Sequence, residues 1–133
     1  MKEFLKKYNI SEEDFEKTGL NWNDLLEIKT NYESIINTLE PPARFLLENF
    51  HKVENVHSVR YRLKNSEKLI AKIIRKRIDE PQRIINLHNY QSEVTDLIGL
   101  RILHLFKEDW LSIHKYIMGN WDPQETPIAY IRK

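Results

Sequence analysis

The sequence has no cysteine and only three glycines among its 133 residues. The absence of cysteine excludes disulfides, thiolate chemistry and the usual structural zinc sites. The glycines, Gly19, Gly99 and Gly119, stand far apart, so the sequence contains no glycine-rich phosphate loop, dinucleotide fingerprint or nucleophile elbow. Any phosphate group would therefore have to be bound by side chains.

Long apolar runs are also missing. No run approaches the roughly 20 apolar residues that a membrane helix needs, and the acid-rich N-terminus lacks the apolar core of a signal peptide. The five histidines show no HExxH or other metal-ligand spacing. With 41% hydrophobic and 31% charged residues, the chain is predicted to be a single soluble, cytoplasmic domain over residues 1–133.

The net charge of +1 conceals a strong local asymmetry. Residues 51–77 contain nine Lys or Arg residues against two acidic residues, Glu54 and Glu67, whereas residues 1–50 and 78–133 are both net acidic. A local excess of positive charge indicates a local role, such as binding an anionic ligand or a nucleic acid.

Helices are predicted for the N-terminal region, residues 1–53. Ser11 is a suitable N-cap because three acidic residues follow it. From Asn23 onward, apolar residues recur every three or four positions, as on one face of a helix; these are Leu25, Ile28, Tyr32, Ile35, Ile36 and Leu39. Pro41 is expected to force Glu40 out of the α region and to end this helix, so a second helix is predicted from Pro42.

A strand followed by a helix is predicted where the basic residues concentrate. From Val56 to Lys64 apolar and cationic residues alternate, which predicts a strand with one apolar and one cationic face. Ser66 can then cap a helix with apolar residues on one side and basic residues on the other. The apolar set is Leu69, Ile70, Ile73 and Ile74, and the basic set is Lys68, Lys72, Arg75 and Lys76.

The remaining elements complete the predicted fold class. The run Gly99–Phe106 is almost wholly apolar, as in a central strand that is buried on both faces. A helix is predicted from about Asp109 to Tyr116, and a third strand at Ile128–Ile131. Because helices come first and β-α-β-α-β follows, the fold class is predicted to be α+β, with an α/β-like mixed sheet over residues 54–133.

Two groups of residues suggest chemistry on phosphates. Arg and Lys supply the donors that phosphates need, and here they are Arg60, Arg62, Lys64, Lys68 and Lys72. From charge alone, a solvated basic face on an ordinary β-α unit stays open as an alternative, and so does a nucleic-acid surface. Asp96 lies at the edge of the most apolar strand, where a carboxylate can hold Mg²⁺ against phosphates. Alternatively, Asp96 is a cap or turn residue and Arg101 is an ion-pair partner.

Together these groups resemble a known family. Arg62-Leu63-Lys64, a helix carrying Lys72, and the run from Asp96 to Ile102 (DLIGLRI) resemble the RelA/SpoT synthetase domain over roughly residues 40–133. The resemblance implies a nucleotidyltransferase-like mixed sheet and transfer of pyrophosphate from ATP to the 3′-hydroxyl of GDP or GTP. It further implies that Arg62, Lys64 and Lys72 contact the phosphates of ATP, that Asp96 binds Mg²⁺, and that Arg101 supports catalysis in the same region. Arg60 and Lys68 are added to the predicted ATP side because they share the basic face.

The sequence also departs from the family pattern. Lys68 stands where the family commonly has a serine, and Ile128-Ala129-Tyr130-Ile131 stands where it has K-D-Y-I. The segment that binds the guanine nucleotide and the second catalytic glutamate are expected beyond Lys133, so the chain is expected to carry the ATP and Mg²⁺ half of a site. Three alternatives stay open: a relative that pyrophosphorylates the 3′ end of tRNA, a non-catalytic nucleotide- or RNA-binding module, and a homo-oligomer formed through an exposed sheet edge.

Overall fold

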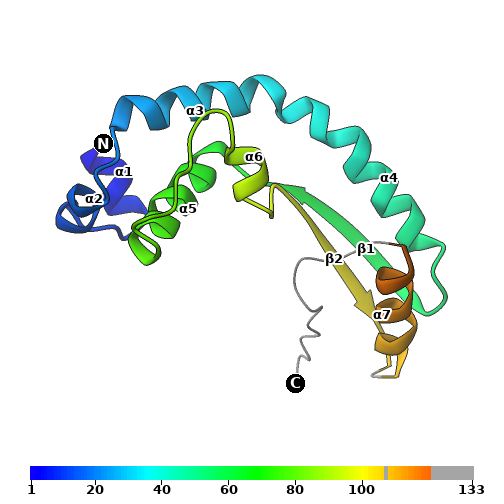
Figure 1. Cartoon of the computed structure of the whole chain (residues 1–133). Helices are drawn as coiled ribbons and strands as arrows, with labels where there is room; N and C mark the ends of the chain where they lie inside the picture. Colours follow the sequence, from blue (N-terminus) through cyan, green and yellow to red (C-terminus); the bar gives the residue numbers. More distant parts are fainter. Residues whose placement is uncertain (107, 121–133) are drawn as a thin grey trace. The chain divides into compact units, whose positions relative to one another are not determined.

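A computed structural model describes residues 1–106 and 108–120 of the chain. The described residues form an α+β fold with a helical N-terminal region, which confirms the predicted fold class (Figure 1). They divide into two compact units, residues 1–40 with 63–99, and residues 41–62 with the described part of 100–133. Each unit is described here by itself.

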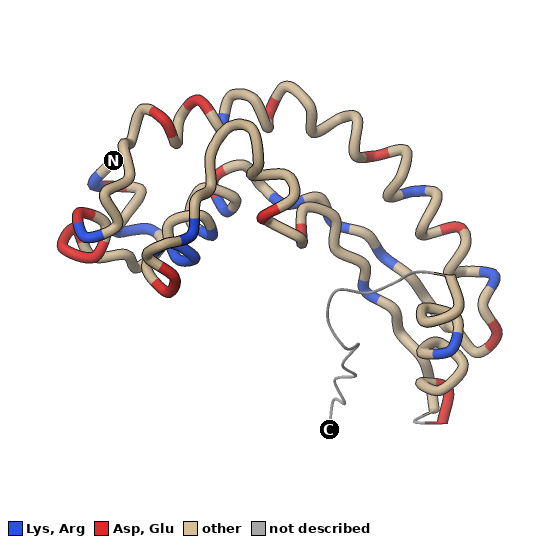
Figure 2. The backbone as a smooth tube through the Cα atoms, in the orientation of Figure 1, with Lys and Arg blue, Asp and Glu red and all other residues tan. Residues whose placement is uncertain are grey.

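The first unit begins with three helices, α1 (Lys2–Lys7), α2 (Glu12–Thr18) and α3 (Trp22–Ile35). The predicted cap at Ser11 is confirmed, because its hydroxyl accepts a hydrogen bond from the backbone N–H of Asp14 at 3.0 Å. Helix α2 ends at Gly19, whose φ of 69° lies in the left-handed region that glycine adopts without steric cost. Figure 2 shows acidic residues along α2 and α3, and basic residues along α5.

Helix α5 (Ser66–Asp79) is the centre of this unit. Its predicted apolar residues are buried and form one core with residues from all three N-terminal helices; this core includes Leu5, Phe15, Leu25, Ile28, Tyr32, Leu69, Ile70, Ile73 and Ile74. The prediction of Ser66 as the cap is wrong. Asn65 is the N-cap, and its side chain accepts hydrogen bonds from the N–H groups of Glu67 and Lys68, because an asparagine one residue earlier serves this position equally well.

The structure does not show the predicted break of the helix at Pro41 and Pro42. Instead, the helix type changes just before them. A 3₁₀-helix, η1 (Ile36–Leu39), follows α3, and helix α4 (Glu40–His51) begins before Pro41. Glu40 has α-helical dihedral angles, so the prediction that it leaves the α region is wrong. Pro41 and Pro42 occupy the first turn of α4, where a missing backbone N–H leaves no helical hydrogen bond unmade.

Strands β1 (Val56–Leu63) and β2 (Ile98–His104) pair in an antiparallel, two-stranded sheet. Strand β1 alternates in exposure as predicted, but β2 is not buried on both faces, because Leu103 is half exposed. An apolar run predicts burial only if further elements cover both faces of the sheet. The predicted third strand at Ile128–Ile131 lies outside the described residues.

Two further helices complete the described part of the chain. Helix α6 (Tyr90–Glu93) precedes β2. The predicted helix at Asp109 is confirmed as α7 (Asp109–Asn120), and in the second unit it buries Ile113. Among the described residues, no helix combines the length and the hydrophobicity that crossing a bilayer requires.

Candidate phosphate-binding site

Three of the predicted site residues meet in the first unit. The Nζ atoms of Lys64 and Lys72 lie 3.1 Å and 2.9 Å from the same carboxylate oxygen, Oδ2 of Asp96. The Lys64 side chain is only 15% exposed, whereas that of Asp96 is 45% exposed. The cluster is therefore anchored in the protein on the Lys64 side and open to solvent on the Asp96 side.

The ends of the two strands bring these residues together. Lys64 directly follows β1, and its backbone N–H donates to the carbonyl of Leu97 at 2.8 Å, just before β2. This bond extends the strand pairing by one step and places Lys64 beside Asp96. Lys72 reaches the same carboxylate from α5, where it lies one helical turn after Lys68.

Burial and the two lysines act in opposite directions on the Asp96 carboxyl. Partial burial raises its pKa, but hydrogen bonds from Lys72 and Lys64 outweigh that effect, so the net pKa lies below the ordinary value. Asp96 is therefore a carboxylate at neutral pH, and it is the counterion of both lysines.

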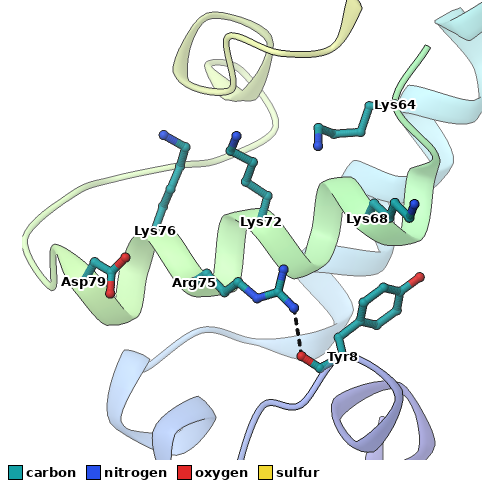
Figure 3. A pocket seen from close by; sticks show the side chains of 7 residues that line it. All are labelled: Tyr8, Lys64, Lys68, Lys72, Arg75, Lys76 and Asp79. Atoms are coloured by element: carbon teal, nitrogen blue, oxygen red, sulfur yellow. Dashed lines mark hydrogen bonds between the residues drawn. The ribbon is translucent and has the colours of Figure 1, made fainter. Parts of the chain in front are cut away.

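A pocket of about 540 Å³ opens along the same face of α5. Figure 3 shows the residues that line it: Tyr8, Lys64, Lys68, Lys72, Arg75, Lys76 and Asp79. Five of these seven side chains are cationic, so the pocket favours an anionic ligand. Asp79, the last residue of α5, is acidic and gives the pocket one anionic side chain.

Tyr8 is a pocket residue that the sequence patterns did not reveal. Its carbonyl accepts a hydrogen bond from Nη2 of Arg75 at 2.8 Å, and its hydroxyl donates to Glu67 at 2.9 Å. More than fifty residues separate Tyr8 from either partner, and no local motif signals such a contact. Arg75 and Lys76 were predicted on the basic face of this helix with Lys68 and Lys72, but they were not predicted as site residues.

The other predicted site residues lie in the second unit. Arg60 and Arg62 are on β1 and Arg101 is on β2, and all three are exposed. For Arg60 and Arg62 this agrees with the predicted cationic face of the strand. The structure thus groups Lys64, Lys68, Lys72 and Asp96 in one unit. The roles of Arg60, Arg62 and Arg101 stay predictions.

Asp96 can hold a hard cation such as Mg²⁺ only when a bound phosphate ligand supplies further oxygen atoms. A carboxylate is the oxygen donor that Mg²⁺ prefers, and Mg²⁺ commonly uses one or two protein carboxylates with waters and substrate phosphates. Within residues 1–106 and 108–120, no group of three or more His, Cys, Asp or Glu side chains could hold a metal ion. Asp96 therefore fits a site that a phosphate ligand completes, and does not fit an all-protein metal cage.

The comparison with family models gave one match. The model described as the region found in RelA / SpoT proteins matches residues 61–132, just over half of the chain. This range contains Lys64, Lys68, Lys72 and Asp96 and begins after α3. Comparisons with curated proteins and with solved structures found no match.

Proposed function

Because the chain belongs to the family that carries the region found in RelA and SpoT proteins, we propose that its Lys64–Lys72–Asp96 cluster binds the phosphates of ATP. In this proposal the chain supplies the donor side of a site that transfers pyrophosphate to the 3′-hydroxyl of GDP or GTP. The product is guanosine tetra- or pentaphosphate. The observation that carries the proposal is the convergence of two lysines on one carboxylate beside a cationic pocket.

The cationic side chains provide the charge that a polyphosphate needs. Lys64 and Lys72 act as point charges that can each donate to phosphate oxygens, and Lys68, Arg75 and Lys76 extend the positive field along α5. The described glycines form no phosphate loop, so side chains take the role that backbone N–H groups have in other nucleotide sites.

Asp96 is the proposed ligand of Mg²⁺. When bound, Mg²⁺ supplies positive charge that neutralises phosphate oxygens. Asp96 would then exchange its lysine partners for the cation, and Lys64 and Lys72 would turn to the phosphates. All three side chains already share one place in the first unit, because the lysine nitrogens lie 3.1 Å and 2.9 Å from the carboxylate.

The proposed reaction is a displacement at the β-phosphorus of ATP. The 3′-oxygen of the guanosine forms a bond to that phosphorus and releases its proton, the bond to the oxygen that bridges the α- and β-phosphates breaks, and AMP leaves with that oxygen. Positioning and charge neutralisation account for most of the catalysis of such a transfer, and no covalent enzyme intermediate is needed. The cluster of two lysines and a carboxylate is suited to both tasks.

Isothermal titration with a non-hydrolysable ATP analogue, with and without Mg²⁺, tests the proposal. We expect Mg²⁺-dependent binding by the wild-type chain. Lys72→Ala is expected to weaken it about tenfold to a hundredfold, as when a charged hydrogen bond is lost, and Asp96→Asn is expected to remove the dependence on Mg²⁺. Lys17→Ala is the matched control, because Lys17 also pairs with a carboxylate, that of Glu13 at 3.2 Å, but lies on α2 outside the pocket.

Two results would contradict the proposal. One is binding of the analogue that neither site variant changes. The other is no binding of the analogue by the wild-type chain. If RNA then binds with a steep dependence on salt, which reports many phosphate contacts, the basic face is assigned to nucleic acid.

A further inference from the structure

Tyr32 connects α3 to the candidate site through one hydrogen bond. Its side chain is fully buried, and its hydroxyl donates to the backbone carbonyl of Lys64 at 2.6 Å. The N–H of Lys64 is also bonded, to the carbonyl of Leu97 at 2.8 Å. Both backbone polar groups of Lys64 therefore have fixed partners at the point where β1 ends.

We propose that Tyr32 is a positioning residue for the phosphate-binding site, which holds the backbone of Lys64 so that its ammonium group points at Asp96 and at an incoming phosphate. This inference rests on the proposed function. It assigns a role to α3, which lies outside the residues that the family model matches.

The argument starts from the flexibility of lysine. A lysine side chain has four rotatable bonds, and ordering it costs up to about 2 kcal/mol of conformational entropy. Lys64 nevertheless pairs with Asp96, with its Nζ atom 3.1 Å from Oδ2 and its side chain largely buried. Fixing its backbone on both sides reduces the positions that its Cα atom can take, which limits the volume that the ammonium group samples.

The hydroxyl of Tyr32 is suited to this role across the physiological pH range. Burial, together with the nearby Tyr90 and Asp96, raises the pKa of the Tyr32 phenol above its ordinary value. The group therefore remains protonated and remains a donor. Without it, the Lys64 carbonyl would lose its partner in a half-buried position, which favours a shift of the chain at the end of β1.

Tyr90 provides a matched control within the same unit. It is also fully buried, its ring meets the Tyr32 ring edge-on at 6.3 Å, and its hydroxyl donates to Asn31 on α3 at 2.6 Å. Removing either hydroxyl keeps the aromatic ring and deletes one buried hydrogen bond. The Tyr32 bond reaches the backbone of Lys64, and the Tyr90 bond ends on a side chain of α3.

The experiment compares Tyr32→Phe with Tyr90→Phe in the full chain. Titration with the non-hydrolysable ATP analogue and Mg²⁺ gives the dissociation constant, and NMR gives the amide exchange rate and carbonyl chemical shift of Lys64. We expect Tyr32→Phe to raise the dissociation constant about fivefold to tenfold and to speed exchange at Lys64, while Tyr90→Phe changes binding by less than about twofold. Melting temperatures check that both variants fold.

The two readouts separate the failure of this inference from the failure of the proposed function. Equal dissociation constants for the two variants, or Lys64 signals that Tyr32→Phe leaves unchanged, would overturn the inference. A wild-type chain that does not bind the analogue would overturn the proposed function. In that case the NMR signals of Lys64 alone test the inference. A change in these signals in Tyr32→Phe, but not in Tyr90→Phe, supports the positioning of Lys64 by Tyr32.

Discussion

At the scale of single residues, the charge of Asp96 links the stability of the first unit to pH. Its Oδ2 atom contacts both Lys64 and Lys72, and its net pKa in the folded protein is below the ordinary value of 3.8. A carboxyl with a lowered folded-state pKa stabilises the protein above the ordinary pKa, and this contribution is lost as the pH falls through the folded-state value. The same carboxylate therefore has a structural effect that can be measured without a ligand.

We predict that Asp96→Asn lowers the melting temperature at pH 7, because two lysines then face each other without a counterion. The difference from the wild type should shrink below pH 3.8, since the wild-type carboxyl becomes neutral there as well. Thermal unfolding of both proteins from pH 7 down to about pH 2.5 measures this. Glu13→Gln serves as the control, because its pair with Lys17 is well exposed and contributes little. A difference that stays constant over this range would contradict the prediction.

At the scale of elements, the N-cap residue determines where helix α5 begins and therefore how its basic side chains are directed. The Oδ1 atom of Asn65 accepts from the N–H of Glu67 at 2.8 Å and from the N–H of Lys68 at 3.4 Å. The adjacent Ser66 donates instead to Glu33 at 2.8 Å. Asn65 therefore caps the helix, and it does so immediately after Lys64.

We predict that Asn65→Ala lowers the free energy of unfolding by about 1 kcal/mol, the usual cost of losing an N-cap. Asn65→Asp should retain the stability, because a carboxylate accepts the same hydrogen bonds and suits the positive end of the helix dipole. Urea unfolding measures both variants. Ser66→Ala is the matched control with a smaller expected effect, and a larger loss for Ser66→Ala than for Asn65→Ala would assign the cap to the serine.

Local periodicity was sufficient to predict most of these elements. Alternation predicted β1, and apolar spacing predicted the face of α5 that is buried. One error arose because Asn65 and Ser66 both suit the N-cap position. The other arose because the first turn of a helix accepts proline, so that Glu40 keeps α-helical dihedral angles before Pro41. The exposure of β2 could not be predicted, because burial depends on which elements cover a strand.

The candidate site was predictable only in part, for a related reason. Lys64, Lys72 and Asp96 were selected by residue type and spacing, but their mutual pairing depends on how residues 64 and 96 and helix α5 pack together within the first unit. Tyr8 follows α1 as its C-cap residue, and Tyr32 lies on the apolar face of α3; both are far earlier in the chain than their partners. Their contacts with Arg75 and Lys64 arise from tertiary packing, which a single sequence does not reveal.

At the scale of the whole molecule, the matched region shares its core with residues that precede it. Helices α2 and α3 pack against α5, and Leu5, Phe15 and Leu25 belong to the same buried cluster as Leu69 and Ile73. Arg77 on α5 also donates to the carbonyl of Thr18 at 3.2 Å. Residues 61–132 thus contain the candidate ligands but only part of the core that holds them in place.

We predict that a fragment of residues 61–132 does not fold cooperatively. It would expose the apolar face of α5, and each fully buried aliphatic side chain stabilises a fold by roughly 1.5–3 kcal/mol, against a typical total of about 5–15 kcal/mol for a domain. Thermal and urea unfolding, followed by circular dichroism, should show a cooperative transition for residues 1–133 and a broad or absent one for the fragment. A sharp transition of the fragment would show that the N-terminal helices are dispensable.

In the proposed site, the pairing of Asp96 with both lysines would also affect which anions bind. Because the carboxylate belongs to the same chain, it competes with any arriving phosphate at a high effective concentration. An anion that comes alone must displace Asp96 and leave it without a partner, whereas an anion that brings its own divalent cation offers Asp96 a replacement. If the cluster binds phosphates as proposed, it would therefore favour cation–nucleotide complexes over inorganic phosphate and metal-free nucleotides.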